Sequence, residues 1–298
     1  MSDVPRQSDP EDSLVPGAGG GSGGGSGSGS GGGPADKPAG RAVPFRGGGF
    51  APASGRAAAW IAFALVIAAW QLGSSTGFIH PLTLPSPEDI VAALIDLARS
   101  GDLWRHLSAS LGRLALGWSL GTLAGLAVGL SLGMFSLARS IGVPFVSALF
   151  PIPKIALLPL FIIWFGIGEP SKIATILFGV FFPTVINTYS GVDNVARSLI
   201  RMGQGFDMPI RDIVLKIVLP GALPAILSGF RISASIAIVL LVAAEMIGAE
   251  WGVGALVLAA GNLMQTDYLI AGVLLLSLIG LTIGIVLGRL ENWLLRWR

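Results

Sequence analysis

The chain contains no cysteine among its 298 residues. This absence excludes a disulfide framework, a thiolate metal site and a cysteine nucleophile. Charge is scarce too, because Asp, Glu, Lys and Arg make up only 12% of the sequence, far below the share of about a quarter in soluble domains. With 52% apolar residues and a mean hydropathy of +0.75, the composition predicts a protein that crosses a membrane several times.

Histidine is almost as rare as cysteine. His80 and His106 lie far apart, and neither has a second ligand at metal-binding spacing. We interpret both as ordinary polar loop residues and expect neither a metal site nor a catalytic residue.

The first 56 residues differ in composition from the rest. They contain the run GAGGGSGGGSGSGSGGG, followed by prolines and scattered arginines. Such a segment cannot bury enough apolar surface to fold. We therefore predict a disordered Gly/Ser-rich cytoplasmic tail over 1–56, with a tether for a partner as the alternative, and a membrane domain over 57–298.

Six apolar segments approach the roughly 20 residues that a membrane-crossing helix needs. They lie at 57–72, 107–134, 141–165, 173–189, 222–247 and 268–287. The third is interrupted by Pro144, Pro151, Pro153 and Pro159, so we expect it to be kinked or broken. Residues 251–264 are too short and too rich in glycine to span. The predicted fold is an all-α integral membrane protein with about six transmembrane helices.

Two further features concern the packing of these helices. Residues 88–104 carry apolar side chains at helical spacing, which predicts a short amphipathic helix on the outer surface. Glycines recur every fourth residue along the second span, at 117, 121, 125, 129 and 133. That stripe predicts a close helix contact, either within one subunit or across a dimer.

The distribution of lysine and arginine predicts the orientation of the spans. Thirteen of these residues lie in the tail, the 135–140 link, the 190–220 segment and the C-terminus, against three on the other side. Basic residues favour the cytoplasmic side. We therefore predict a multi-pass protein of the bacterial cytoplasmic (inner) membrane with both termini in the cytoplasm.

A polar segment, RMGQGFDMPIRDIVLKIVLP at 201–220, separates the fourth and fifth spans. It predicts two short helices joined by a turn, with Asp207 capping the second, Pro209 in its first turn and Pro220 closing it. Ile210, Ile213, Val214 and Ile217 recur along one face of that second helix. We expect a rigid hairpin against the cytoplasmic ends of the spans.

The same segment resembles the cytoplasmic loop of bacterial ABC importer permeases, which begins Glu-Ala-Ala and ends Ile-x-Leu-Pro. Ile217, Leu219 and Pro220 occupy the closing positions, and Gly203 fits the small third position. Arg201 replaces the acidic first residue, Met202 replaces alanine and Asp207 replaces glycine. The resemblance extends over about 57–298. PIPKIALLPLFIIWFGIGEPSKI (151–173), FFPTVINTYSGV (181–192), LPSP (84–87) and AEMIG (244–248) are similar to the nitrate, sulfonate and taurine branch.

The resemblance implies a function and a set of partners. The loop would form coupling helices that contact a cytoplasmic ABC ATPase, through Arg201, Gly203, Asp207, Ile217, Leu219 and Pro220. The sequence lacks the phosphate-binding pattern GxxxxGK[ST]. ATP would therefore be used by a separate ATPase, and the chain itself would be a permease subunit without enzymatic activity or a cofactor. Further implied partners are an extracytoplasmic solute-binding protein and a second permease subunit, forming a homodimer in the lipid bilayer; no nucleic acid is implied.

The substrate would be a small solute, such as a sulfonate, taurine, nitrate or bicarbonate anion. Polar or helix-breaking residues within apolar spans are candidates for lining its path: Pro151, Pro153, Lys154, Asn187 and Glu245. For each a structural role is also open. Lys154 can extend to the interface, Glu245 can accept bonds from backbone N–H groups, and Asn187, with Thr184, can hydrogen-bond across helices.

Two other classes of function stay open from the sequence. A secondary transporter or channel driven by an ion gradient would show inverted repeats and paired broken helices, whereas this chain has one proline-broken span and no counterpart of the polar segment. A membrane enzyme would need a convergent cluster of acids and histidines, and His80, His106 and Glu169 are scattered.

Overall fold

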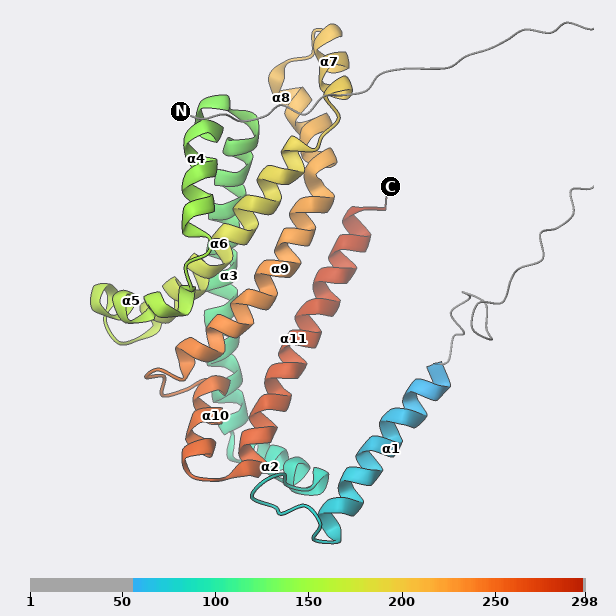
Figure 1. Ribbon diagram of the computed structural model, residues 1–298, viewed down its shortest axis with the longest axis vertical. Helices are drawn as coiled ribbons and strands as arrows, with labels where there is room; N and C mark the ends of the chain where they lie inside the picture. The colour runs from blue at the N-terminus through green and yellow to red at the C-terminus, as the bar shows by residue number, and fades with distance from the viewer. Residues whose placement is uncertain (1–55, 297–298) are drawn as a thin grey trace, which may run out of the picture. The chain divides into compact units, whose positions relative to one another are not determined.

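The computed structural model describes residues 56–296, and the predicted tail therefore lies almost wholly outside the described residues. Within that range the secondary structure is helical, which confirms the predicted all-α class. Figure 1 shows long helices running roughly side by side, with short helices at both of their ends.

Within residues 56–296, four helices are long and apolar enough to cross a membrane, and a fifth span results if a bent pair is counted as one. The long ones are α3 (Asp102–Met134), α6 (Glu169–Asp193), the continuous helical segment Ile210–Glu245, and α11 (Thr266–Leu294). The first predicted span coincides with α1 (Arg56–Ser75), whose apolar part, Trp60–Ser75, is shorter. The count of six stays a prediction.

The proline-rich third span is broken, as its composition predicted. α4 (Ser136–Leu149) ends before Pro151, a single 3₁₀ turn covers Lys154–Leu157, and α5 (Leu158–Phe165) follows. The two halves meet at an angle of 89°. Proline lacks the N–H that continues a helix and its ring collides with the preceding turn, so the break falls where prolines cluster.

The helices α3 and α6 make the most extensive contact in the bundle, along the glycine stripe. A Cβ atom at Gly125 would lie 2.7 Å from Thr184 Cβ, and one at Gly129 would lie 2.6 Å from Thr188 Cβ. The two backbones therefore approach closely only because side chains are missing. The stripe mediates a contact inside one chain, which decides between the two options left open by the sequence.

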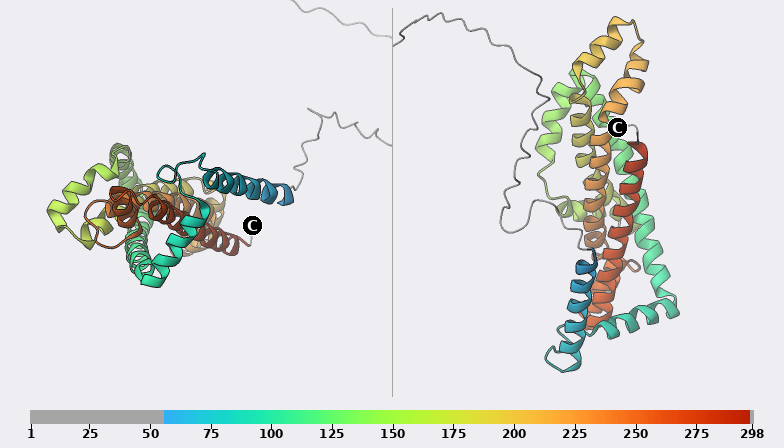
Figure 2. Two further views of the ribbon diagram at one scale, coloured as in Figure 1. Left: turned by 90° about the horizontal axis from the view of Figure 1, so that it is seen from below. Right: turned by 90° about the vertical axis from the view of Figure 1, so that its right-hand side faces the viewer.

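The short helices lie at opposite ends of the spans. α2 (Pro87–Ser100) is the predicted amphipathic helix, and Ser86 and Asp89 cap its start reciprocally. α10 (Val253–Asn262) lies at the same end, whereas α7 (Arg197–Gly205) and α8 (Ile210–Ile213) lie at the other (Figures 1 and 2). The C-terminal end of α11 points toward the α7–α8 end.

Candidate functional site

The hairpin formed by α7 and α8 ends its first helix differently from the prediction. Asp207 adopts a left-handed backbone, with φ of +51°. The Met208 N–H donates to Gly203 O at 3.1 Å and the Asp207 N–H to Gln204 O at 3.0 Å. These two bonds form a Schellman ending of α7. Asp207 therefore terminates the first helix, and the prediction that it caps the second was wrong.

The second arm of the hairpin is continuous with the following span. A π-helical turn, Val214–Val218, connects α8 to α9 (Leu219–Glu245), and Pro220 lies in the first turn of α9. Pro220 does not close the element, contrary to the prediction. Proline is tolerated in a first helical turn, and a π-turn relieves the i→i−4 geometry that its ring would obstruct.

The hairpin buries one face and exposes another. Gly203 is buried, and a Cβ there would lie 3.1 Å from Ile217 Cδ1 and 3.3 Å from Ile213 Cγ1. Phe206 and Ile210 at its tip are 76% and 81% exposed. The prediction that Ile210 shares one face with Ile213 and Ile217 was therefore wrong. An apolar tip of this size on a polar loop is typical of a protein-docking surface.

Three arginines lie along the hairpin. Arg197 and Arg201 lie four residues apart on α7, and Arg211 lies on α8; all three are exposed. Lys216 pairs with Asp212 at 2.8 Å. Among residues 56–296, Arg197 and Arg201 form no ion pair, so they add positive charge to α7.

Lys154 lies at the break between α4 and α5. Its Nζ donates to the carbonyl oxygens of Leu149 at 3.0 Å, Phe150 at 2.5 Å and Ile152 at 2.7 Å. The Nζ atom also lies 4.7 Å from the centre of the Phe182 ring. A cation at the C-terminal end of a helix satisfies carbonyls that have no intrahelical partner, so Lys154 stabilises the bend.

A groove of about 560 Å³ opens beside Lys154, between the broken span, α6 and α9. Its lining is mostly apolar, with Ser235 and the Lys154 ammonium as polar groups; the other lining residues are Phe150, Ile152, Ile155, Gly179, Pro183, Ile236, Val239, Leu240 and Ala243. Pro151, Pro153, Asn187 and Glu245 do not line it. Of the predicted path residues, Lys154 alone reaches this groove.

Asn187 and Thr184 bond within their own helix, contrary to the prediction that they join neighbouring helices. Asn187 Nδ2 donates to Pro183 O at 2.8 Å, and Thr184 Oγ1 donates to Val180 O at 2.9 Å. Both side chains satisfy their polarity locally because the neighbouring positions are occupied by closely packed backbone. Gly229 of α9 is one such position, since a Cβ there would lie 2.6 Å from Asn187 Cβ.

Glu245 belongs to a buried ionic network at the end of α9 opposite the hairpin. Its side chain is fully buried, and it accepts bonds from Ser110 Oγ at 2.8 Å, from Arg113 Nη1 at 2.7 Å and from the Gly254 N–H at 2.9 Å. Every oxygen of this carboxylate is therefore satisfied by α3 and α10, as buried charge requires.

Arg113 is the centre of the network, although the sequence analysis did not single it out. It is 4% exposed and forms a bidentate pair with Glu169, with both nitrogen–oxygen distances at 2.6 Å. Its Nη1 also donates to Trp251 O at 2.6 Å. Arg113 thus joins α3, the start of α6, the end of α9 and the α9–α10 loop (246–252). Its position inside an apolar run was a usable signal.

Two more polar side chains complete this end of the bundle. Lys172, 3% exposed, donates to Gly168 O at 3.0 Å and to Gly248 O at 3.3 Å. His106 is buried in α3, where Nδ1 lies 2.8 Å from Gly252 O. His106 is therefore not a loop residue, contrary to the prediction, because it holds the backbone of the α9–α10 loop.

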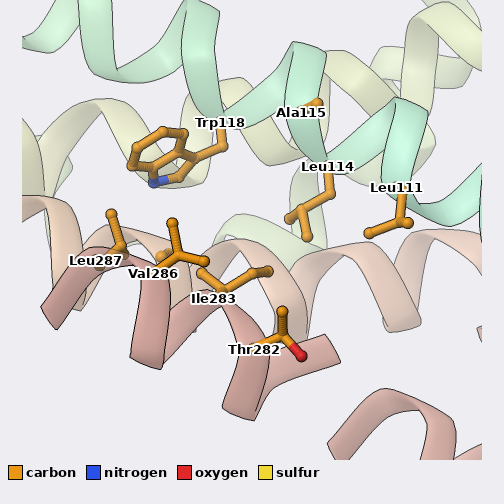
Figure 3. A pocket seen from close by; sticks show the side chains of 9 residues that line it. Leu111, Leu114, Ala115, Trp118, Thr282, Ile283, Val286 and Leu287 are labelled. Atoms are coloured by element: carbon orange, nitrogen blue, oxygen red, sulfur yellow. The ribbon is translucent and has the colours of Figure 1, made fainter. Parts of the chain in front are cut away.

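A second hollow, of about 270 Å³, lies between α3 and α11. Figure 3 shows the Trp118 ring and the aliphatic side chains of both helices facing it. The Trp118 Nε1 donates to Ser233 Oγ at 3.0 Å, which leaves the hollow almost without polar groups. A crevice of this kind offers nothing to stabilise an anion.

Four long apolar helices, one broken span, an amphipathic hairpin at one end and a buried ionic network at the other are the features of a polytopic membrane protein, and similarity to known proteins assigns it to transport. Residues 121–297 match the family of the binding-protein-dependent transport system inner membrane component. The chain is 36% identical over 242 residues to SsuC of Escherichia coli K12, described as an aliphatic sulfonates transport permease protein; the match covers 81% of this chain and 92% of SsuC. It is 35% identical over 239 residues to the taurine transport system permease protein TauC of the same organism, covering 78% of this chain and 87% of TauC.

The fold agrees with solved transporters. An inward-facing structure of the MetNI methionine ABC transporter superposes with a TM-score of 0.55 at 22% identity, covering 64% of this chain and 95% of that one. The chain belongs to the family of binding-protein-dependent inner-membrane permeases. It is the permease subunit of an ABC importer, and such a subunit acts with a separate ATPase and a solute-binding protein.

Proposed function

We propose that the chain forms the path for a small organic sulfonate, such as taurine or another alkanesulfonate. The observation that carries this proposal is the similarity to SsuC and TauC over about four-fifths of the chain. Nitrate and bicarbonate are the competing anions. In proteoliposomes containing the chain, its ATPase and its binding protein, labelled taurine or an alkanesulfonate should accumulate with ATP. Uptake of nitrate or bicarbonate alone would contradict the proposal.

The groove beside Lys154 is the proposed wall of that path. It is open on the face formed by the broken span, α6 and α9, and one chain leaves it unenclosed. A second copy of the chain facing it would close the path, which supports a homodimer. Lys154 contributes positive charge to this groove and would attract a sulfonate.

The role of Lys154 can be tested by keeping or removing its positive charge. Lys154→Arg keeps the cation, whereas Lys154→Met removes it; we expect the Met variant to raise the KM for sulfonate in the reconstituted importer and the Arg variant to restore it. If both variants assemble normally and have the wild-type KM, Lys154 acts only on the bend.

The hairpin is the proposed docking site for the ATPase on the cytoplasmic side. This assignment rests on the exposed Phe206 and Ile210 beside buried Gly203 and on the lysine and arginine bias, which also supports cytoplasmic termini. ATP is bound by that partner and not by this chain. The other residues that we propose to contact the ATPase, or to hold the hairpin in shape, are Arg201, Asp207, Ile217, Leu219 and Pro220.

Cysteine crosslinking tests this assignment without interference from native cysteines of the permease, since the chain contains none. Phe206→Cys and Ile210→Cys should crosslink to cysteines in the ATPase, whereas Phe78→Cys, which is 91% exposed and lies in the link between α1 and α2, should not. An intact complex without a hairpin crosslink would refute the docking site.

A further inference from the structure

In the buried network, Arg113 pairs with two carboxylates, Glu169 and Glu245, that differ in exposure. Glu245 is 0% exposed and Glu169 is 58% exposed, although both bond to Arg113, which is 4% exposed. Glu169 therefore lies at the surface of the chain, whereas Glu245 would lose its partner inside protein. Exposed pairs contribute little to stability, and buried ones are costly to break.

The Glu169 carboxylate can separate from Arg113 without leaving the guanidinium unpaired. If Glu169 separates from Arg113, the guanidinium still faces the carboxylate of Glu245 at 2.7 Å and Trp251 O at 2.6 Å. Arg113 therefore keeps a carboxylate partner, and the buried Lys172 keeps its bonds to Gly168 O and Gly248 O; the cost of the release is the one net positive charge that Arg113, Lys172 and Glu245 then share. The reverse does not hold, because loss of Glu245 would strand Arg113 beside one exposed carboxylate.

The backbone on both sides of the Glu169 arm has turn points. Gly166, just after α5, has φ of +81°, and Gly248 in the α9–α10 loop has φ of +75°. A Cβ at Gly248 would lie 3.6 Å from Ile167 Cγ2, so the α5–α6 link and the α9–α10 loop touch directly beside the ion pair. Few-residue links of this kind absorb the backbone rotation when packed segments separate.

We infer that Arg113 is a positioning residue of the transport cycle, with Glu245 as its permanent partner and Glu169 as a releasable one. Release of Glu169, together with loss of the Lys172 bond to Gly248 O, would let the α5–α6 link separate from the α9–α10 loop at the end of the bundle opposite the hairpin. This inference rests on the proposed function only in assuming an ATP-driven cycle. Ser110 and the Gly254 N–H keep Glu245 in place throughout.

A reversible crosslink across this contact tests the separation. Ile167→Cys combined with Gly248→Cys should form a disulfide, because the Cβ added at position 248 would lie 3.6 Å from Ile167 Cγ2. The left-handed backbone strains a cysteine at Gly248, so the reduced double variant must first import at the wild-type rate. In the complete importer, oxidation should lower uptake about tenfold or more and reduction should restore it, because a blocked conformational step stops turnover. Full uptake by the oxidised pair would overturn the inference.

A substitution that does not depend on the crosslink supplies the second test. Glu169→Gln should raise the ATPase activity measured without binding protein by a factor of about 2 to 5, the size expected for losing an exposed ion pair, and should raise ATP hydrolysed per solute imported. Asp193→Asn is the matched control, because Asp193 also lies on α6 and forms a bidentate pair, with Arg139.

The two tests separate this inference from the proposed function. Equal coupling ratios in wild-type protein, Glu169→Gln and Asp193→Asn would assign the network to stability alone and refute the releasable arm. Such a result would leave the hairpin crosslinks to the ATPase untouched. Missing hairpin crosslinks, in contrast, would refute the docking site and not the separation at Arg113.

Discussion

Several polar side chains in this chain bond to the backbone or occupy a special backbone position. Lys154 caps the end of α4, His106 holds the loop at Gly252, and Asp207 occupies a left-handed position. Each is polar and lies in or near an apolar span, which is also how a transport site would look in a sequence. Only the hydrogen-bond partners distinguish the two roles.

Asp207 offers the first residue-scale prediction. Asp207→Gly should stabilise the hairpin by about 1 kcal/mol, because glycine avoids the steric cost of the left-handed region. Slower hydrogen exchange of the amides around Met208 would show it. Gln204→Gly, one turn earlier inside α7, should destabilise by about the same amount; faster exchange in both variants would contradict the explanation.

The two carboxylates bound to Arg113 give a second prediction at this scale. Glu245→Ala should lower the free energy of unfolding by about 3–5 kcal/mol, since it leaves a buried guanidinium without its partner. Glu169→Ala should cost about 1 kcal/mol or less. Denaturation of the purified permease in detergent measures both, and equal losses would show that the difference in exposure has no energetic consequence.

The arrangement of helices in this protein depends on glycines, which lack a side chain, and on prolines, which lack an N–H group. The glycine stripe lets α3 and α6 approach, whereas prolines divide the third span into α4 and α5. Both features could be predicted from spacing alone, because they depend on local chemistry.

The stripe yields a prediction at the scale of the helix pair. Gly125→Ile should prevent α3 and α6 from packing, because even a Cβ there would lie 2.8 Å from Phe181 O. Gly112→Ile is the control, since that glycine is on the same helix with open space around it. We expect aggregation or proteolysis of the first variant in membranes and normal yield of the second; normal yield of both would refute close packing.

Most spans could be predicted from hydropathy, but the ion-pair partners on different helices could not. Arg113, Glu169 and Glu245 lie on three helices, and each reads in the sequence as one isolated charge. Their pairing depends on how α3, α6 and α9 pack, which periodicity does not reveal. The end of the hairpin was mispredicted for a similar reason, since a π-turn joining α8 to α9 has no sequence signature that we recognised.

At the scale of the whole molecule, the chain must match a particular ATPase. Arg197 and Arg201 form an i,i+4 pair of like charges on the hairpin, which is unfavourable in isolation. A carboxylate on the partner would compensate them. We therefore predict that Arg197→Glu with Arg201→Glu weakens ATPase binding about tenfold or more.

Pull-down of the ATPase at low salt measures this effect. Arg99→Glu with Arg105→Glu, at the α2 end of the bundle, is the control and should leave binding unchanged. Binding of the wild-type chain should also fall as salt rises, because exposed charges are screened. Salt-independent binding, with no effect of the double reversal, would show that apolar contacts suffice.

The continuous helical segment from Ile210 to Glu245, which includes the π-turn, has a mechanical consequence. Its 36 residues make a lever about 54 Å long at 1.5 Å per residue. A tilt of about 5° imposed at the tip would shift the far end by about 5 Å, on the order of one helical turn. If the tilt passes the π-turn at Val214–Val218 and Pro224, where the segment departs from a regular α-helix, it moves Glu245 and the Arg113 guanidinium bonded to it.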